Sequence, residues 1–106
     1  MLDVKVDVVN VLEDVVREWF VERGLHEGDG SGQLIKLREE MQELLDAHEA
    51  GNEEDVIDAV GDITVVLIGY AMQKGLRLSE CLLSAYGEIR HRTGHVDENG
   101  VFVKDE

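Results

Sequence analysis

The sequence contains no proline among its 106 residues, and its apolar residues recur at spacings of three and four. Proline breaks the interior of a helix, so its absence permits long helices, and this spacing is typical of helices that bury one face. Aromatic residues make up only 5% of the chain, whereas a sandwich of many short strands is enriched in them. We therefore predict an all-α fold.

The apolar periodicity predicts four helices. Their expected ranges are about 4–22, 33–49, 53–74 and, starting at 78 or 79, up to 91. Serine is a favoured N-cap residue, so we predict that Ser79 caps the fourth helix. A turn sequence at 97–100 then precedes alternating apolar residues, which favours a short hairpin or extended arm. We expect one bundle-like domain over residues 1–106, with its helical core at about 4–92 and a C-terminal arm at about 93–106.

The chain is strongly acidic, with 24 Asp and Glu residues against 10 Lys and Arg and a formal net charge of −14. A field of this sign disfavours nucleic acid and anionic membranes as partners, because both bind positive charge. Ten of the carboxylates lie within residues 39–62, while five of the ten basic residues lie from residue 74 onward. Such a chain could bind a metal through its acidic middle segment and phosphate through its more basic C-terminal segment. The alternative is a solvated acidic surface.

Cys81 is the single cysteine, so no internal disulfide can form, and we expect a cytoplasmic protein. The N-terminal residues interleave acids with valines and lack the basic stretch and apolar run of a signal peptide. The longest apolar stretch, residues 63–72, is too short to span a bilayer.

Two acids interrupt the most apolar of the expected helices. Asp58 and Asp62 are four residues apart and therefore lie on one face of a helix that is apolar on nearly every side, the pattern of a buried helix. Burying an ionised carboxylate without a partner is unfavourable, and two like charges increase the cost. No Lys or Arg lies between Arg38 and Lys74 to pair with them locally. We infer that a cation meets these acids.

The preceding helix supplies further carboxylates for such a cation. Lys36, Glu40 and Glu43 share one stripe of this helix, because spacings of three and four bring side chains together. Carboxylate oxygens suit magnesium or manganese. The acids of the third helix could instead lie on an exposed strip or pair with arginines of the fourth helix.

Glu88 and His91 are three residues apart, which is half of the pattern of a di-iron bundle site. Such a site needs a second copy of the pair, and no other histidine has a glutamate three residues before it. We therefore take His91 as a surface or phosphate-side residue.

The two groups of acids resemble the signature of the MazG-like all-α NTP pyrophosphohydrolases. The matching segments are Glu39-Glu40-x-x-Glu43 and, after a gap of fourteen residues, Asp58-Ala59-Val60-Gly61-Asp62-Ile63. The tail is similar to the end of short members of this family, including many encoded by phages. Its matching segments are Ala85-Tyr86-Gly87-Glu88-Ile89-x-x-Arg92-x-Gly94 and Gly100-Val101-Phe102-Val103-Lys104. The resemblance covers roughly residues 33–104.

The chain departs from the family pattern at two positions. The pattern has Glu three residues before the final Asp, where this chain has Ala59, and Asp58, one residue earlier, replaces it. A spacing of four keeps Asp58 and Asp62 on one face, so metal binding is compatible with the change. Gly87 stands where many relatives carry Asn, in a region expected to contact the substrate.

The resemblance implies a magnesium-dependent hydrolase, with manganese as a possible substitute, that cuts nucleoside triphosphates between the α and β phosphates. It implies a homodimer or tetramer in which helices of two chains build the active site. The implied metal ligands are Glu40, Glu43, Asp58 and Asp62. Glu39 is implied to orient or deprotonate the attacking water. The implied phosphate contacts are Lys36, Arg90, Arg92 and Lys104, with Arg92 foremost.

Three functional hypotheses follow. The first is hydrolysis of dNTPs or NTPs to nucleoside monophosphate and pyrophosphate, with a role in controlling the nucleotide pool. The second is the same chemistry on another nucleotide, such as an alarmone or phosphoribosyl-ATP, because the metal motif does not select the base. The third is a non-catalytic acidic helical protein that binds a basic partner. It explains the charge but not the two acids within the apolar helix.

Overall fold

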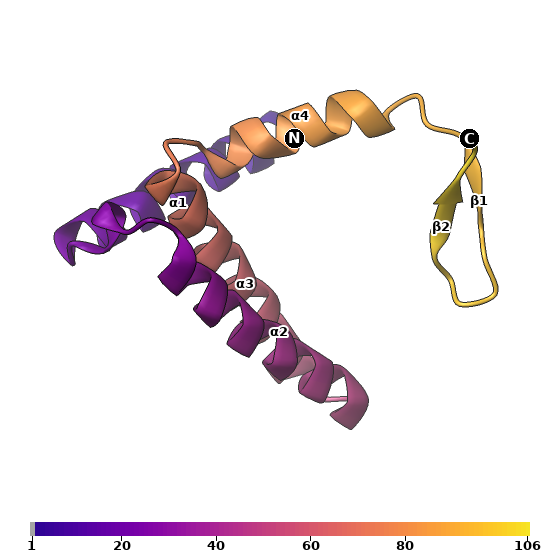
Figure 1. The fold of residues 1–106 in the computed structure, drawn as a ribbon, viewed down its shortest axis with the longest axis horizontal. Helices are drawn as coiled ribbons and strands as arrows, with labels where there is room; N and C mark the ends of the chain where they lie inside the picture. Colours follow the sequence, from indigo (N-terminus) through magenta and orange to yellow (C-terminus); the bar gives the residue numbers. More distant parts are fainter. Residues whose placement is uncertain (1) are drawn as a thin grey trace.

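The computed structural model describes residues 2–106, with side chains described from Val9 onward. The described residues form five helical segments and two strands (Figure 1). In chain order they are α1 (Leu2–Glu22), a short 3-10 helix η1 (Leu25–Glu27), α2 (Ser31–Ala50), α3 (Glu53–Gln73), α4 (Leu78–Ile89), β1 (Gly94–Val96) and β2 (Phe102–Lys104). The predicted all-α helical bundle is confirmed, and the helix ends lie within about two residues of those predicted, the usual uncertainty of helix boundaries. None of the helices in the described residues is long and apolar enough to cross a membrane.

Helices α2 and α3 form an antiparallel hairpin that projects from the rest of the molecule (Figure 1). Gly51 ends α2 in the left-handed conformation, with a φ of 67°, and its N–H donates to the carbonyls of Ala47 and His48. Asn52 follows as the N-cap of α3, and its side chain accepts the Asp55 N–H at 3.1 Å. The tight connection places the C-terminal half of α2 beside the N-terminal half of α3, where the acidic residues lie.

The core is small and lies where α3 meets α1 and α2. The buried apolar side chains are Phe20, Ala47, Ala59, Val66, Ile68 and Ala71. The ring of Phe20 in α1 lies against Gly69 of α3, in space that a Cβ on Gly69 would occupy. This close approach fixes where α1 crosses α3.

A carboxylate of α1 holds the first turn of α4. Glu13, which is buried, accepts the N–H of Leu78 at 2.7 Å and the N–H of Ser79 at 3.3 Å. Helix α4 begins at Leu78 with Arg77 at its N-cap position, so the prediction that Ser79 is the N-cap is wrong. The physical reason is that a side chain distant in sequence satisfies the N–H groups that a local cap would otherwise bind.

The predicted C-terminal hairpin is confirmed. Strands β1 and β2 pair antiparallel, with Gly94 opposite Lys104 and Val96 opposite Phe102. The Asp97 side chain accepts the N–H groups of Asn99 and Val101 and so shapes the turn between the strands. The hairpin lies at the far end of α4, away from the α2–α3 hairpin (Figure 1).

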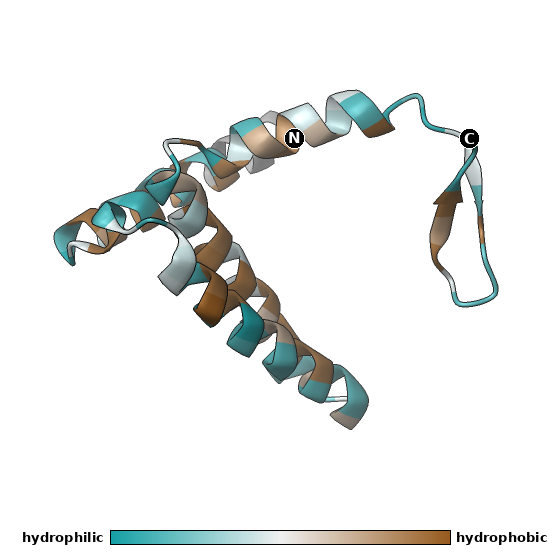
Figure 2. Ribbon diagram, in the orientation of Figure 1, coloured by the Kyte–Doolittle hydropathy of each residue, from teal (hydrophilic) through white to brown (hydrophobic). Residues whose placement is uncertain are grey.

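The single chain is extended for its size. Its radius of gyration is 16.1 Å, whereas a compact domain of this length has a value of about 13 Å. Hydrophobic residues line the helices and β2 (Figure 2), and many of them are exposed to solvent. Even α3, which the sequence predicts to be buried on nearly every side, leaves Ile57 and Val60 exposed. That prediction is wrong for the isolated chain, because only the C-terminal half of α3 is covered by α1.

Candidate metal centre

Three carboxylates from two helices converge near the middle of the α2–α3 hairpin. Glu40 and Glu43 lie three residues apart on one stripe of α2, and Asp62 comes from the facing side of α3. One ligand oxygen from each of the three lies within 4.8 Å of the others. Converging carboxylate oxygens are the donors that magnesium and manganese prefer.

Glu40 is the buried member of this cluster, with a side chain that is 6% exposed. Its Oε1 lies 3.2 Å from the Lys36 ammonium, while its Oε2 is buried and has no hydrogen-bond partner among the described residues. Buried polar atoms almost always have a hydrogen-bond partner. A bound cation would supply the missing interaction for a buried carboxylate oxygen that lies beside two further carboxylates. The residues present therefore fit a divalent metal.

The cluster perturbs its own protonation. The pKa of Glu43 is raised above its ordinary value of 4.5, mainly by the neighbouring Glu40 carboxylate. The pKa of Glu40 is lowered, mainly by the neighbouring Glu43 and also by Lys36, against the effect of its burial. Two like charges at this separation are costly together, so either a proton or a metal relieves them.

Lys36 and Glu39 lie on the edge of the cluster. The Lys36 ammonium bridges Glu39 at 3.4 Å and Glu40 at 3.2 Å, and both carboxylates raise the pKa of Lys36. Glu39 is exposed and lines a shallow depression on α2 with Arg38 and Gln42, outside the group of three carboxylates.

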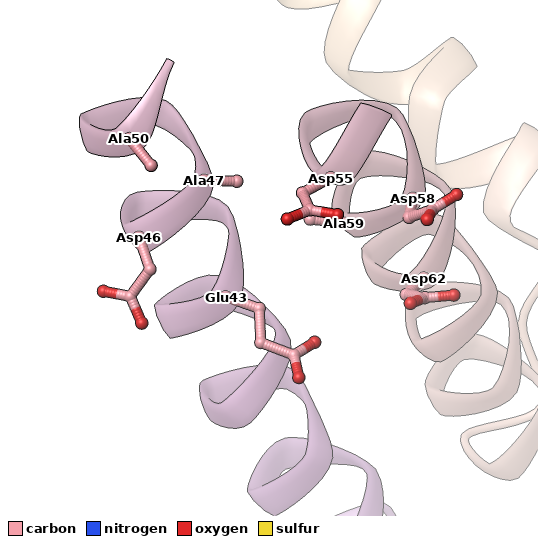
Figure 3. Close-up of a pocket in the computed structure, with 8 residues that line it drawn as sticks. All are labelled: Glu43, Asp46, Ala47, Ala50, Asp55, Asp58, Ala59 and Asp62. Atoms are coloured by element: carbon pink, nitrogen blue, oxygen red, sulfur yellow. The ribbon is translucent and has the colours of Figure 1, made fainter. Parts of the chain in front are cut away.

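A pocket of about 540 Å³ extends from the cluster toward the tip of the α2–α3 hairpin (Figure 3). Its lining consists of carboxylates and alanines: Glu43, Asp46, Ala47, Ala50, Asp55, Asp58, Ala59 and Asp62. Glu43 extends from α2 toward α3, where Asp58 and Asp62 lie one turn apart (Figure 3). Small alanines on both helices leave the space that the acids surround.

The structure brings together Glu40, Glu43 and Asp62, and it places Asp58 in the adjoining pocket. Asp58 and Asp62 are themselves exposed in the single chain, so the expectation that they are buried is wrong. The buried acid is Glu40 instead, because α3 covers the stripe of α2 on which it lies.

Sequence reasoning missed Asp46 as a pocket residue. It lies three residues after Glu43, a predicted ligand, so helical spacing places it on the same face and could have found it. Asp55, which also lines the pocket, lies one turn before Asp58 on the face that helical spacing gives to Asp58 and Asp62.

Of the four basic residues predicted to contact phosphate, Lys36 lies beside the cluster and the other three lie elsewhere. Arg90 follows α4, and its guanidinium lies 5.9 Å from the centre of the Tyr86 ring. Arg92 lies between α4 and β1, and Lys104 ends β2. These segments lie apart from the α2–α3 hairpin (Figure 1), so one chain does not bring them to its own carboxylates.

The helical hairpin with its carboxylate cluster is a candidate site for a divalent metal in an all-α protein, and sequence comparison indicates the class of protein. A family model described as phosphoribosyl-ATP pyrophosphohydrolase (PRA-PH) matches residues 11–85, from α1 into α4. The chain belongs to this family, which is part of the MazG-like all-α nucleotide pyrophosphohydrolase superfamily. The match indicates a hydrolase acting on phosphoric anhydrides, in a superfamily that generally uses divalent metals. No curated protein and no solved structure matches the chain.

Proposed function

We propose that this protein hydrolyses nucleoside triphosphates, dNTPs or NTPs, between the α and β phosphates, with magnesium as its metal. The observation that carries the proposal is the buried Glu40 carboxylate, whose unpaired Oε2 lies beside Glu43 and Asp62. A triphosphate brings further negative charge to this site, so a cation is needed both for the protein and for the substrate. The reaction class of the family supports the same chemistry.

In this reaction the oxygen of a water molecule bonds to the α-phosphorus. The bond from that phosphorus to the bridging oxygen breaks, and pyrophosphate leaves with the electron pair. Bound magnesium would supply charge neutralisation and a more acidic water. Glu40, Glu43 and Asp62 would hold the cation, with Asp58 as the fourth proposed ligand. Glu39, beside Glu40 on α2, is proposed to orient the water and accept its proton.

Phosphoribosyl-ATP is the second candidate substrate, because the matching family model carries that name. It contains the same α–β anhydride, and its cleavage also releases pyrophosphate. The carboxylate cluster acts on the triphosphate, so it serves either substrate equally. Discrimination between them would depend on contacts to the base and sugar.

The test is product analysis of the purified protein with a panel of dNTPs, NTPs and phosphoribosyl-ATP in the presence of magnesium. We expect a nucleoside monophosphate, or phosphoribosyl-AMP, together with pyrophosphate, and no turnover in EDTA. Glu40→Gln and Asp62→Asn should abolish turnover. Glu49→Gln is the matched control, because Glu49 lies on α2 but outside the cluster and the pocket.

Thermal unfolding with and without magnesium provides a readout that does not depend on activity. A metal that binds only the folded chain raises the melting temperature by mass action. We expect this rise in the wild type and in Glu49→Gln but not in Asp62→Asn. A rise that persists in both Asp62→Asn and Glu43→Gln would refute the site, and no turnover with no response to magnesium would favour a non-catalytic acidic module that binds a basic partner.

A further inference from the structure

Among the described residues, Lys36 is the basic residue that forms an ion pair with the carboxylate cluster. Its ammonium lies 3.2 Å from Oε1 of Glu40 and 3.4 Å from Oε2 of Glu39. All three residues lie on α2, at spacings of three and four that bring side chains together. The partners of Lys36 are therefore two carboxylates of its own helix.

The two oxygens of the Glu40 carboxylate have different surroundings. Oε1 faces the Lys36 ammonium, whereas Oε2 is buried and has no hydrogen-bond partner among the described residues. The Glu40 side chain is only 6% exposed, so its charge is costly without a partner, while the Lys36 side chain is 55% exposed. Lys36 thus neutralises Glu40 from the solvent side and leaves Oε2 for a second cation.

Lys36 and a bound metal would both neutralise Glu40. Without a metal, Lys36 is the cation paired with the buried carboxylate among the described residues. With a metal, the carboxylate has a second and more highly charged partner, and the two cations repel each other. Lys36 therefore stabilises the metal-free cluster more than the metal-bound one. Because linkage is reciprocal, a group with this preference lowers the affinity for the metal.

We propose that Lys36 is the internal counter-ion of Glu40, which stabilises the metal-free cluster and weakens metal binding, and that Lys36 is not a contact for the phosphates of the substrate. The family resemblance implies such a phosphate contact. To make one, however, the ammonium would have to leave both of its carboxylate partners. The statement about phosphate rests on the proposed function, while the effect on metal binding does not.

Titration of the EDTA-treated and dialysed protein with Mn²⁺ tests the effect on metal binding, with the free ion measured by electron paramagnetic resonance. Lys36→Met keeps an apolar stem and removes the charge. We expect it to bind Mn²⁺ about three- to tenfold more tightly than the wild type, the effect of removing one exposed positive charge close to a divalent ion at moderate salt. A site that is merely damaged would lose affinity instead. Lys36→Gln, which is also neutral, should show the same gain.

Two matched variants control for the charge and its position. Lys36→Arg keeps the positive charge and should bind Mn²⁺ as the wild type does. Arg38→Met removes one positive charge from α2 outside the cluster and the pocket, so the affinity should stay unchanged. Affinity in Lys36→Met and Lys36→Gln that is equal to or below that of the wild type overturns the proposal. An equal gain in Arg38→Met overturns it as well, because the effect would then belong to the net charge.

Thermal unfolding provides a second readout of the same linkage. Lys36→Met should melt below the wild type in EDTA, because Glu40 loses its counter-ion. The difference should narrow at saturating magnesium, since the metal then neutralises the carboxylate. A difference that is the same with and without magnesium would contradict the competition between Lys36 and the metal.

Kinetics separate the proposal from the proposed function. At saturating magnesium, Lys36→Met should keep the KM for the nucleotide within about twofold of the wild type, whereas loss of a phosphate contact would raise KM by about tenfold or more and overturn the proposal. No turnover by the wild type refutes the proposed function, and the Mn²⁺ titration still decides the role of Lys36. A wild type that binds no Mn²⁺ overturns that role.

Discussion

Replacing Glu13 should destabilise the protein by releasing the first turn of α4. The Glu13 carboxylate is 5% exposed and accepts the N–H of Leu78 at 2.7 Å and the N–H of Ser79 at 3.3 Å. Loss of a helix cap costs about 0.5–2 kcal/mol, and each buried N–H left without an acceptor costs about 1–3 kcal/mol. Leu78 and Ser79 are half-buried, so water can replace part of this contact. We expect Glu13→Ala to cost about 2 kcal/mol.

The assay is thermal unfolding followed by circular dichroism at one fixed protein concentration. For a chain of this length, about 2 kcal/mol corresponds to a fall of about 8 °C in melting temperature. Glu13→Gln keeps one acceptor oxygen and should fall by about half as much. Asp14→Asn is the matched control, because Asp14 is exposed and, among the described residues, its side chain pairs with the Arg77 side chain alone. Its melting temperature should change little, since exposed ion pairs contribute little. A Glu13→Ala variant that melts with the wild type would refute the capping argument.

Three further predictions follow from the packing and the charges. Gly69→Ala should cost about 1–3 kcal/mol in unfolding free energy, because its Cβ would overlap the Phe20 ring; chemical denaturation measures this, and an unchanged midpoint would contradict the close packing. Asn52→Ala should cost about 1 kcal/mol by removing the N-cap of α3, with Asn52→Ser expected to retain most of the stability. Glu43→Gln should stabilise the EDTA-treated protein at neutral pH, and this gain should disappear as the pH falls to 4.5. The pKa of Glu43 is raised in the folded state, so the folded state holds the Glu43 proton more tightly than the unfolded state does. The wild type therefore loses stability as that proton leaves, whereas glutamine has no proton to lose. Melting curves of both proteins between pH 4 and 8, with about 0.1 M salt, test the last prediction, and a pH-independent difference would argue against it.

Much of the fold followed from local patterns. The helices end close to the predicted positions because Gly51 and Asn52 act on their own neighbours in the chain. The C-terminal hairpin followed from its turn sequence for the same reason. Predictions of this kind need no knowledge of what packs against each element.

The candidate site was predicted only in part. Helical spacing placed Glu40 with Glu43 and Asp58 with Asp62, and the short connection between α2 and α3 brought the two pairs to one hairpin. The phosphate contact of Arg92 was implied by the family resemblance, and only the structure shows that Arg92 lies between α4 and β1, in a segment apart from the α2–α3 hairpin (Figure 1).

The sequence by itself determined which residues form helices and which acids share a helical face, because both depend on a period of 3.6 residues along one element. Only the tertiary structure decided that Glu40 is the buried acid and that Glu13 caps a helix more than sixty residues away. It also decided that the β1–β2 hairpin lies away from the α2–α3 hairpin (Figure 1). Burial and long-range pairing depend on which faces of separate elements meet, and that choice is made by packing rather than by the local pattern.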